Sequence, residues 1–182
     1  MKSDVPARQK IKNGFLELME EKNLSAIKVI DIIKVSSISH QTFYRMFLDK
    51  YELAESVCYD KLHLIWSVVG KNPTFKEAVV CTLNIIGNNE ALFGHLLAED
   101  DGITIIKKVL VSIFKEMTPH ELSSMVQLAW INTLIDWCGT GFKTPVEQVY
   151  DNLLSSMPVG IVLPAEDKAK YYQAFSDNRI HN

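Results

Sequence analysis

The chain has 182 residues, of which 47% are hydrophobic and 23% charged, and its net charge is −3. This composition supports a folded core and excludes a wholly disordered chain. Three cysteines are too few for a scaffold held together by disulfides, and the absence of a C-x-x-C pair argues against a zinc ribbon or a redox dithiol, so reduced, buried thiols are expected. The start of the chain is polar and no apolar run reaches the roughly 20 residues that span a bilayer, so we expect a cytoplasmic protein.

The charge is divided unevenly along the chain. Residues 1–50 carry a net charge of +3, whereas residues 51–182 carry −6. A small basic segment can bind phosphate even when the whole protein is acidic. Chance unevenness of a few charges explains the split equally well, so a nucleic-acid function needs support from a motif.

Hydrophobic spacing predicts helices in the first part of the chain. The first helix is expected over 7–22, with Asn23 ending it in a left-handed conformation. Two short helices over 28–34 and 39–47 follow, with a turn of small residues between them. Glu52 to Val69 is expected to form one longer helix.

The later helices are punctuated by caps, glycines and prolines. Asn72 is expected to cap a helix that has Pro73 at its first position, and the acidic run 99–102 is expected to end a later one. Thr118-Pro119 and Thr144-Pro145 each precede a glutamate in the spacing of a capping box. The expected helices are 73–86, 90–98, 103–116, 119–138 and 145–157. No strand pattern or internal repeat is evident, so the predicted fold class is all-α, with a boundary near residue 50.

The stretch KVIDIIKVSSISHQTFYRMFLDK, residues 28–50, carries the functional signal. Phe43 and Phe47 lie one turn apart and are expected to point inward. Ser39 and Thr42 lie at the helix start, where free backbone N–H groups favour phosphate. The outward strip combines hydrogen-bonding groups, a phenol and a guanidinium, which suit base edges and phosphates in a major groove: His40, Gln41, Tyr44 and Arg45.

Residues 7–54 resemble the DNA-binding head of the TetR/AcrR family of bacterial transcriptional regulators. The matching positions are Ile32, Ile38, Ser39, Thr42, Phe43, Tyr44, Phe47, Lys50 and Leu53. The resemblance implies a three-helix helix-turn-helix DNA-binding domain over 1–50 and a helical effector-binding and dimerisation domain over 51–158. Residues 159–182 are left as a tail without an assigned structure, apart from a short helix around 165–176.

The sequence departs from the family pattern in four ways. Ser36-Ser37 replaces the usual alanine-glycine of the turn, and Ser37 is therefore expected to adopt a left-handed conformation. Ile33 replaces a small residue. Lys28 replaces a threonine, which exchanges a hydroxyl contact to phosphate for an ammonium contact. Gln41 stands where glycine is common and adds an amide for a base contact.

The resemblance implies a role for each residue of the head. Phosphates would be held by Lys28, Ser39, Thr42, Tyr44 and Lys50, and bases would be read by His40 and Gln41, with Arg45 on the same strip and Thr42 near a thymine methyl. The alternative is that Tyr44 packs on the first helix and His40 is merely solvated.

The helices after residue 50 are assigned to dimerisation and effector binding. Helix 119–138 is apolar nearly all round, which fits a core on one face and a second subunit on another, or else one large intramolecular core. The resemblance favours a homodimer through helices 119–138 and 145–157. The candidate effector-binding residues are His63, Trp66, Cys81, Phe93, His95, Phe114, Trp130 and Trp137. Core packing is the favoured interpretation of each of these residues taken singly.

The predicted function is a ligand-responsive transcriptional regulator, expected to be a repressor, that binds a palindromic operator as a homodimer. An unidentified small molecule would move the helix from Glu52 through a hinge at residues 50–52. The alternative is a protein-interaction module or co-regulator, controlled by a partner protein, with weak or lost DNA binding. No nucleophile, phosphate-loop or H-E-x-x-H motif is present, so we expect no enzyme activity, no cofactor and no metal.

Overall fold

The computed structural model describes residues 6–70, 73–117 and 124–156. Within these ranges the chain forms helices and no strand, which confirms the predicted all-α class. The elements are α1 (Ala7–Met19), η1 (Leu24–Ala26), α2 (Val29–Ser36), α3 (His40–Met46), α4 (Lys50–His63), α5 (Ile65–Val69), α6 (Phe75–Gly87), α7 (Glu90–Leu97), α8 (Asp100–Met117), α9 (Ser124–Gly139) and α10 (Val146–Ser155).

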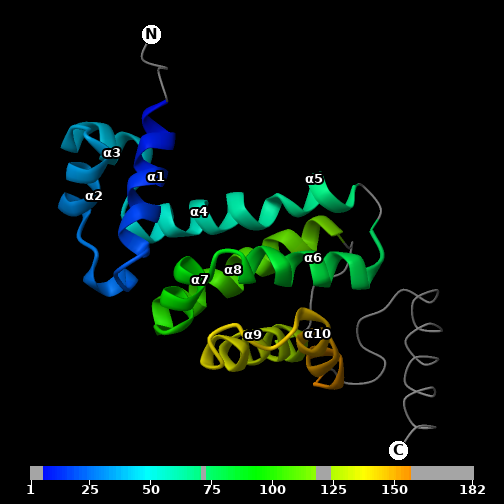
Figure 1. The fold of residues 1–182 in the computed structure, drawn as a ribbon. Helices are drawn as coiled ribbons and strands as arrows, with labels where there is room; N and C mark the ends of the chain where they lie inside the picture. Colours follow the sequence, from blue (N-terminus) through cyan, green and yellow to red (C-terminus); the bar gives the residue numbers. More distant parts are fainter. Residues whose placement is uncertain (1–5, 71–72, 118–123, 157–182) are drawn as a thin grey trace, which may run out of the picture.

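The helices are arranged in tiers (Figure 1). Helices α1, α2 and α3 cluster at one end of the molecule, and α4 runs from this cluster across the rest of the protein. Helix α4 packs on α8, and α9 and α10 form the layer on the far side. The cluster at the end is built on fully buried side chains of α1, α2 and α3, including Phe15, Ile32 and Phe43. The segment that carries the DNA-binding prediction is therefore a packed unit and not a loose arm.

The helix predicted from Glu52 to Val69 is instead two helices, α4 and α5, that meet at Leu64. Helix α4 begins at Lys50 because the Asp49 carboxylate accepts the amides of Tyr51 and Glu52, both at 2.8 Å. At the break, the Ser67 amide donates to the Leu64 carbonyl at 3.0 Å, an i to i−3 bond that tightens the turn. No proline or glycine marks this break in the sequence.

Helix α7 ends at Leu97, just before the acidic run as predicted, but the run also begins α8, which therefore starts at Asp100 and not at residue 103. Asp100 and Asp101 lie in the first turn of α8, where negative side chains are stabilised by the helix dipole. Gly102 allows the corner between α7 and α8 to be very tight, because a Cβ there would lie 2.2 Å from the Leu96 carbonyl oxygen. The glycine is a requirement of close packing between helices rather than a stop signal.

Two further helix starts differ from the prediction. Thr74, not Asn72, caps α6: its hydroxyl accepts the Glu77 amide at 3.2 Å while the Glu77 carboxylate accepts the Thr74 amide at 2.8 Å. Pro145 is the N-cap of α10 and no side-chain cap is made there, so the capping box expected at Thr144 is wrong. Pro73 precedes the cap of α6 instead of opening the helix.

The end of the first helix also differs from the prediction. Helix α1 ends at Met19, and Asn23 has an extended backbone with φ −67° and ψ 155°. The expected left-handed stop is therefore wrong, and the turn η1 follows directly. The predicted start at Thr118, the cap at Asn72 and the tail over 159–182 lie outside the described residues.

Candidate DNA-binding surface

Helix α3 is short and is fixed at both ends by its own sequence. At its start the Ser39 hydroxyl accepts the Thr42 amide at 3.1 Å and lies 2.8 Å from the Thr42 hydroxyl. Its inner face is anchored by Phe43 and Phe47, which are 0% and 1% exposed. A seven-residue helix is too short to be stable alone, so this packing determines where its outer face points.

The turn between α2 and α3 has the geometry that the sequence predicts. Ser37 has φ 51° and ψ 48°, the left-handed conformation expected where the family has glycine. Ser36 is 7% exposed and lies against α1, where a Cβ on Gly14 would come within 2.3 Å of its Oγ. The close crossing of α1 and α2 therefore depends on a glycine in α1 and a small residue in α2.

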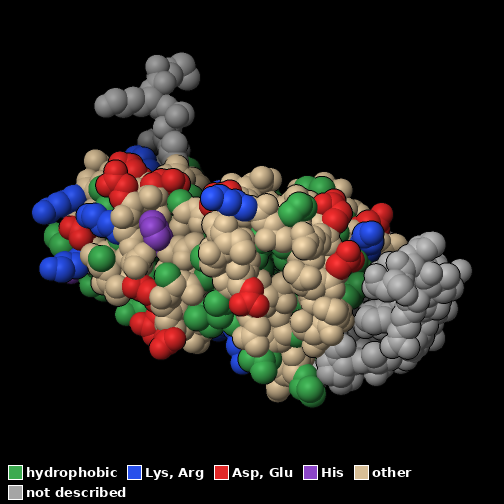
Figure 2. Space-filling model, turned by 60° about the horizontal axis from the view of Figure 1, so that its bottom comes forward, with side chains coloured by type: hydrophobic (Ala, Val, Ile, Leu, Met, Phe, Trp, Pro, Cys, Tyr) green, Lys and Arg blue, Asp and Glu red, His purple; other side chains and the backbone are tan. Residues whose placement is uncertain are grey.

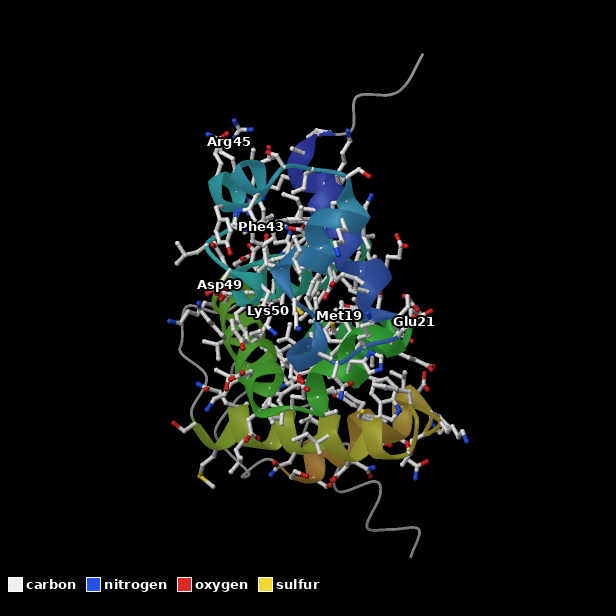
Figure 3. All side chains as sticks on the ribbon, turned by 90° about the vertical axis from the view of Figure 1, so that its left-hand side faces the viewer. Met19, Glu21, Phe43, Arg45, Asp49 and Lys50 are labelled. Carbon is white, nitrogen blue, oxygen red and sulfur yellow. The ribbon has the colours of Figure 1, made fainter. Side chains whose placement is uncertain are left out.

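The outward strip of α3 is open to solvent. The side chains of His40, Gln41, Tyr44 and Arg45 are exposed. The rings of His40 and Tyr44 lie 4.8 Å apart, so the phenol is braced by its neighbour one turn away on the same face. Figure 3 shows Arg45 at the tip of the cluster, pointing away from the body, while Phe43 points inward. A helix with this polar, protruding face matches what a major groove accepts.

The predicted phosphate-binding residues surround this strip. Lys28 is exposed immediately before α2, and its amide donates to the Asp31 carboxylate at 3.2 Å. Ser39 is exposed and Thr42 is partly exposed, with their hydroxyls bonded to each other. Figure 2 shows Lys and Arg side chains gathered at the head end of the molecule. Exposed cations beside a polar helix can bind the DNA backbone.

Lys50 occupies a different environment from the other predicted DNA contacts. Its ammonium donates to the carbonyl oxygens of Leu24, Ser25 and Ile27, at 2.8, 3.2 and 2.9 Å respectively. An ammonium has three protons, so these bonds use its full donor capacity. Sequence reasoning missed this role, because the three carbonyls lie more than 20 residues away along the chain.

Two of the predicted effector residues lie together at a small crevice among the described residues. A crevice of about 10 Å³ lies between α8 and α9, and two of the eight predicted residues, Phe114 and Trp130, line it. Their rings lie 5.2 Å apart. A crevice of this volume holds about one water molecule. Trp130 is 2% exposed, and its indole N–H has no hydrogen-bond partner among the described residues.

Other predicted effector residues have structural partners. Trp137 donates its indole N–H to the Thr144 carbonyl at 2.9 Å, and His95 Nδ1 lies 2.6 Å from the Met19 carbonyl oxygen. Phe93 is fully buried and Cys81 is partly buried. Burial raises the pKa of the Cys81 thiol, which favours an unreactive thiol.

His63 and Trp66 belong to a cluster that sequence reasoning missed. The Glu116 carboxylate accepts the Tyr59 hydroxyl at 2.6 Å and the Trp66 indole N–H at 2.9 Å, and lies 3.4 Å from His63 Nε2. The bond to Glu116 raises the pKa of Tyr59. The cluster ties the end of α4 and the start of α5 to the last turn of α8.

The described residues offer no metal centre or membrane span. Among them, no three His, Cys, Asp or Glu side chains gather as metal ligands. None of the helices in the described ranges has the length and apolar character needed to cross a bilayer. In this part of the chain, the exposed face of α3 and its surroundings form the best-developed candidate site.

Comparison with known proteins supports the fold. No protein-family model matches the sequence, and no curated protein matches it significantly. A solved TetR transcriptional regulator from Streptococcus agalactiae is similar with a TM-score of 0.60 and 23% identity, over 84% of this chain and 94% of that one. The dihydroxyacetone kinase operon activator DhaS is similar with a TM-score of 0.54 and 15% identity, over 82% of this chain and 94% of that one. The chain therefore has the fold of the TetR-type transcriptional regulators.

Proposed function

We propose that the chain is a transcriptional regulator that binds operator DNA through the exposed face of α3. The observation that most directly supports this proposal is an exposed strip on a helix whose inner face is fully packed. The strip consists of His40, Gln41, Tyr44 and Arg45. In this proposal residues 1–50 form the DNA-binding domain and 51–158 the effector-binding and dimerisation domain. Gln41 and His40 read bases, while Lys28, Ser39, Thr42, Tyr44 and Arg45 position the helix on the backbone.

The test is DNA binding measured at several salt concentrations. The probe is a fluorescently labelled duplex from the region upstream of the protein's own gene, with a scrambled duplex as competitor. Arg45→Ala is expected to lower the slope of log affinity against log salt by about 0.9 if it contacts a phosphate. Lys143→Ala removes a cation that is exposed in the loop before α10, and serves as the charge-matched control. Equal affinity for both duplexes by the wild-type chain would refute operator recognition.

The base-reading residues are tested separately. Gln41→Ala and His40→Ala are expected to reduce the preference for the upstream duplex over the scrambled one by about tenfold, since one good base contact contributes about 1–3 kcal/mol. Their affinity for the scrambled duplex is expected to stay near that of the wild type. A uniform loss on both duplexes would assign these residues to the backbone instead.

The exposed face of α9 supports a homodimer. Met125 and Leu128 are 60% and 59% exposed and lie on one side of the helix with Ile135. Burying two such side chains contributes about 1.5–3 kcal/mol each. A second copy that covers this face would place two α3 helices on successive major grooves of a palindromic operator.

Oligomeric state tests this surface directly. Leu128→Glu is expected to shift the chain from dimer to monomer in sedimentation velocity, since it places a charge in the proposed interface. Leu64→Glu is the matched control, because Leu64 is 54% exposed on another element, between α4 and α5. A dimer that survives Leu128→Glu but dissociates with Leu64→Glu would move the interface to α5.

The proposed effector site is the region of the α8–α9 crevice. The unpartnered indole N–H of Trp130 supplies a donor that an acceptor atom on an apolar ligand would satisfy. The crevice is too small for such a ligand as it stands, so binding would have to separate α9 from α8. We propose repression as the sign of regulation, because a bound dimer blocks transcription by occupancy alone. The similar protein DhaS is named as an activator, which is the alternative that a reporter assay would distinguish.

A further inference from the structure

The turn η1, which joins α1 to α2, is held from two sides. From α4, the Lys50 ammonium binds the carbonyls of Leu24 and Ser25 in the turn and that of Ile27 just after it. From the corner between α7 and α8, the Glu99 carboxylate accepts the Ser25 amide at 2.9 Å and also the Ser25 hydroxyl. The carbonyl oxygens of the turn are thus bonded to Lys50 of α4. The amide and hydroxyl groups of Ser25 are bonded to Glu99, between α7 and α8.

The elements that form this corner also contact the end of α1, which precedes the turn, and the start of α4. His95 on α7 lies 2.6 Å, through Nδ1, from the carbonyl oxygen of Met19, the last residue of α1. Tyr51 in the first turn of α4 lies beside Asp101 in the first turn of α8, whose charge raises the pKa of the phenol. The end of α1, the turn and the start of α4 therefore all meet the α7–α8 corner.

The corner itself has little freedom to deform. At Gly102, a Cβ would come within 2.2 Å of the Leu96 carbonyl oxygen, so α7 and α8 are in direct backbone contact. Glu99 lies between the end of α7 and the start of α8 and is partly buried. A shift of this corner must therefore carry the turn with it or break the bonds from Glu99.

We propose that Glu99 is a positioning residue for DNA binding, which fixes the orientation of α2 and α3 by holding η1. The inference rests on the proposed function as a DNA-binding regulator. The turn leads directly into α2, and α2 packs on α3, so the Ser25–Glu99 contact connects the α7–α8 corner to the strip that faces DNA. Movement of α7 or α8 reaches the DNA-binding face through this contact.

The sign of the expected effect separates positioning from general electrostatics. Removing a carboxylate makes the protein more positive, which by itself strengthens binding to DNA phosphates. Releasing the turn has the opposite effect, because a loosely held head must be ordered when it binds. A weaker complex after loss of Glu99 can therefore not come from the change in charge.

The experiment compares Glu99→Ala, Glu99→Gln and the control Glu90→Gln in the full chain. Glu90 lies at the opposite end of α7 and its substitution removes the same charge. Amide hydrogen exchange is expected to show a loss of protection at Ser25 of about tenfold in Glu99→Ala, and a smaller loss in Glu99→Gln, which keeps one acceptor oxygen. Affinity for the labelled upstream duplex is expected to fall about five- to tenfold in Glu99→Ala, with an unchanged salt slope because no phosphate contact is lost.

Each outcome decides the inference. Unchanged protection at Ser25, or unchanged or tighter DNA binding in Glu99→Ala, overturns it. A similar loss of affinity in Glu90→Gln also overturns it, because the effect would not depend on the contact with the turn. If the wild-type chain binds no duplex, the proposed function fails and the positioning role fails with it, whereas exchange at Ser25 still reports whether Glu99 holds the turn.

Discussion

Replacing Lys50 with methionine separates two roles that this side chain can have. The resemblance implies a phosphate contact, whereas the structure shows the ammonium bonded to the carbonyls of Leu24, Ser25 and Ile27. Methionine keeps an unbranched stem of similar length and removes the charge and all three donors. We expect Lys50→Met to destabilise the fold and to leave the number of phosphate contacts unchanged.

The magnitude follows from the environment of the three bonds. Those to Leu24 and Ile27 are partly buried, and the bond to Ser25 is exposed. A hydrogen bond to a charged group contributes about 1.5–3 kcal/mol when water does not replace it, and an exposed one contributes much less. Because water partly reaches the two partly buried bonds, each is expected to contribute about 1–1.5 kcal/mol, and together they predict a loss of about 2–3 kcal/mol in the free energy of unfolding.

The assay combines urea unfolding with DNA binding. Circular dichroism gives the free energy of unfolding for the wild type, Lys50→Met and Lys143→Met, the last being the control at an exposed lysine. Anisotropy with the upstream duplex then gives the salt slope. Unfolding within about 0.5 kcal/mol of the wild type, together with a salt slope lower by about 0.9, would show that the ammonium binds phosphate and refute our interpretation.

Further predictions concern packing, thiols and the Glu116 cluster. Ser36→Ala is expected to raise the free energy of unfolding by about 1 kcal/mol, because the buried hydroxyl has no hydrogen-bond partner within the described part of the chain. Gly14→Ala is expected to lower the free energy of unfolding by about 1–3 kcal/mol through overlap with Ser36, and Ser36→Gly should relieve part of that loss in urea unfolding. Burial raises the pKa of Cys58 to about 12, so the thiol ionises first in the unfolded chain, and the free energy of unfolding should fall as the pH rises from about 9 towards 12. Alkylation of Cys58 should require unfolding, which mass spectrometry can show. Glu116→Gln should lower the pKa of Tyr59 in an ultraviolet titration, whereas Glu147→Gln, on α10, should not.

The head could be predicted from sequence because its determinants are local. The cap at Ser39, the left-handed Ser37 and the inward positions of Phe43 and Phe47 depend on residues within one or two turns of each other. A short-range pattern of this kind fixes the helix, its start and its buried face together. Once the buried face of α3 is known, the opposite face of the helix must be the exposed strip.

The elements that prediction missed depend on contacts between distant residues. The start of α8 at Asp100 requires a glycine that fits against the Leu96 carbonyl, and this is visible only once α7 and α8 are packed together. Trp66, beyond the break between α4 and α5, is bonded to Glu116, 50 residues away. The partners of Lys50 lie 23 to 26 residues from it, so a pattern that marks it as a DNA contact carries no sign of its bonds to the turn.

The same long-range contacts determine how variants of the head must be interpreted. Helix α3 keeps its orientation only through its packing, so a variant that weakens this packing lowers DNA affinity without touching DNA. His40, Gln41 and Arg45 are exposed and have no hydrogen bond or ion pair among the described residues, so their substitution should cost less than about 0.5 kcal/mol of stability. Lys50 and Glu99 are bonded to η1. Their variants should change the protection of the Ser25 amide against hydrogen exchange without changing the number of phosphate contacts. For exposed residues that take no part in the packing of α3, a loss of binding with unchanged exchange at Ser25 therefore identifies a DNA contact. A loss of binding that accompanies faster exchange at Ser25 identifies a residue that positions the helix through the turn.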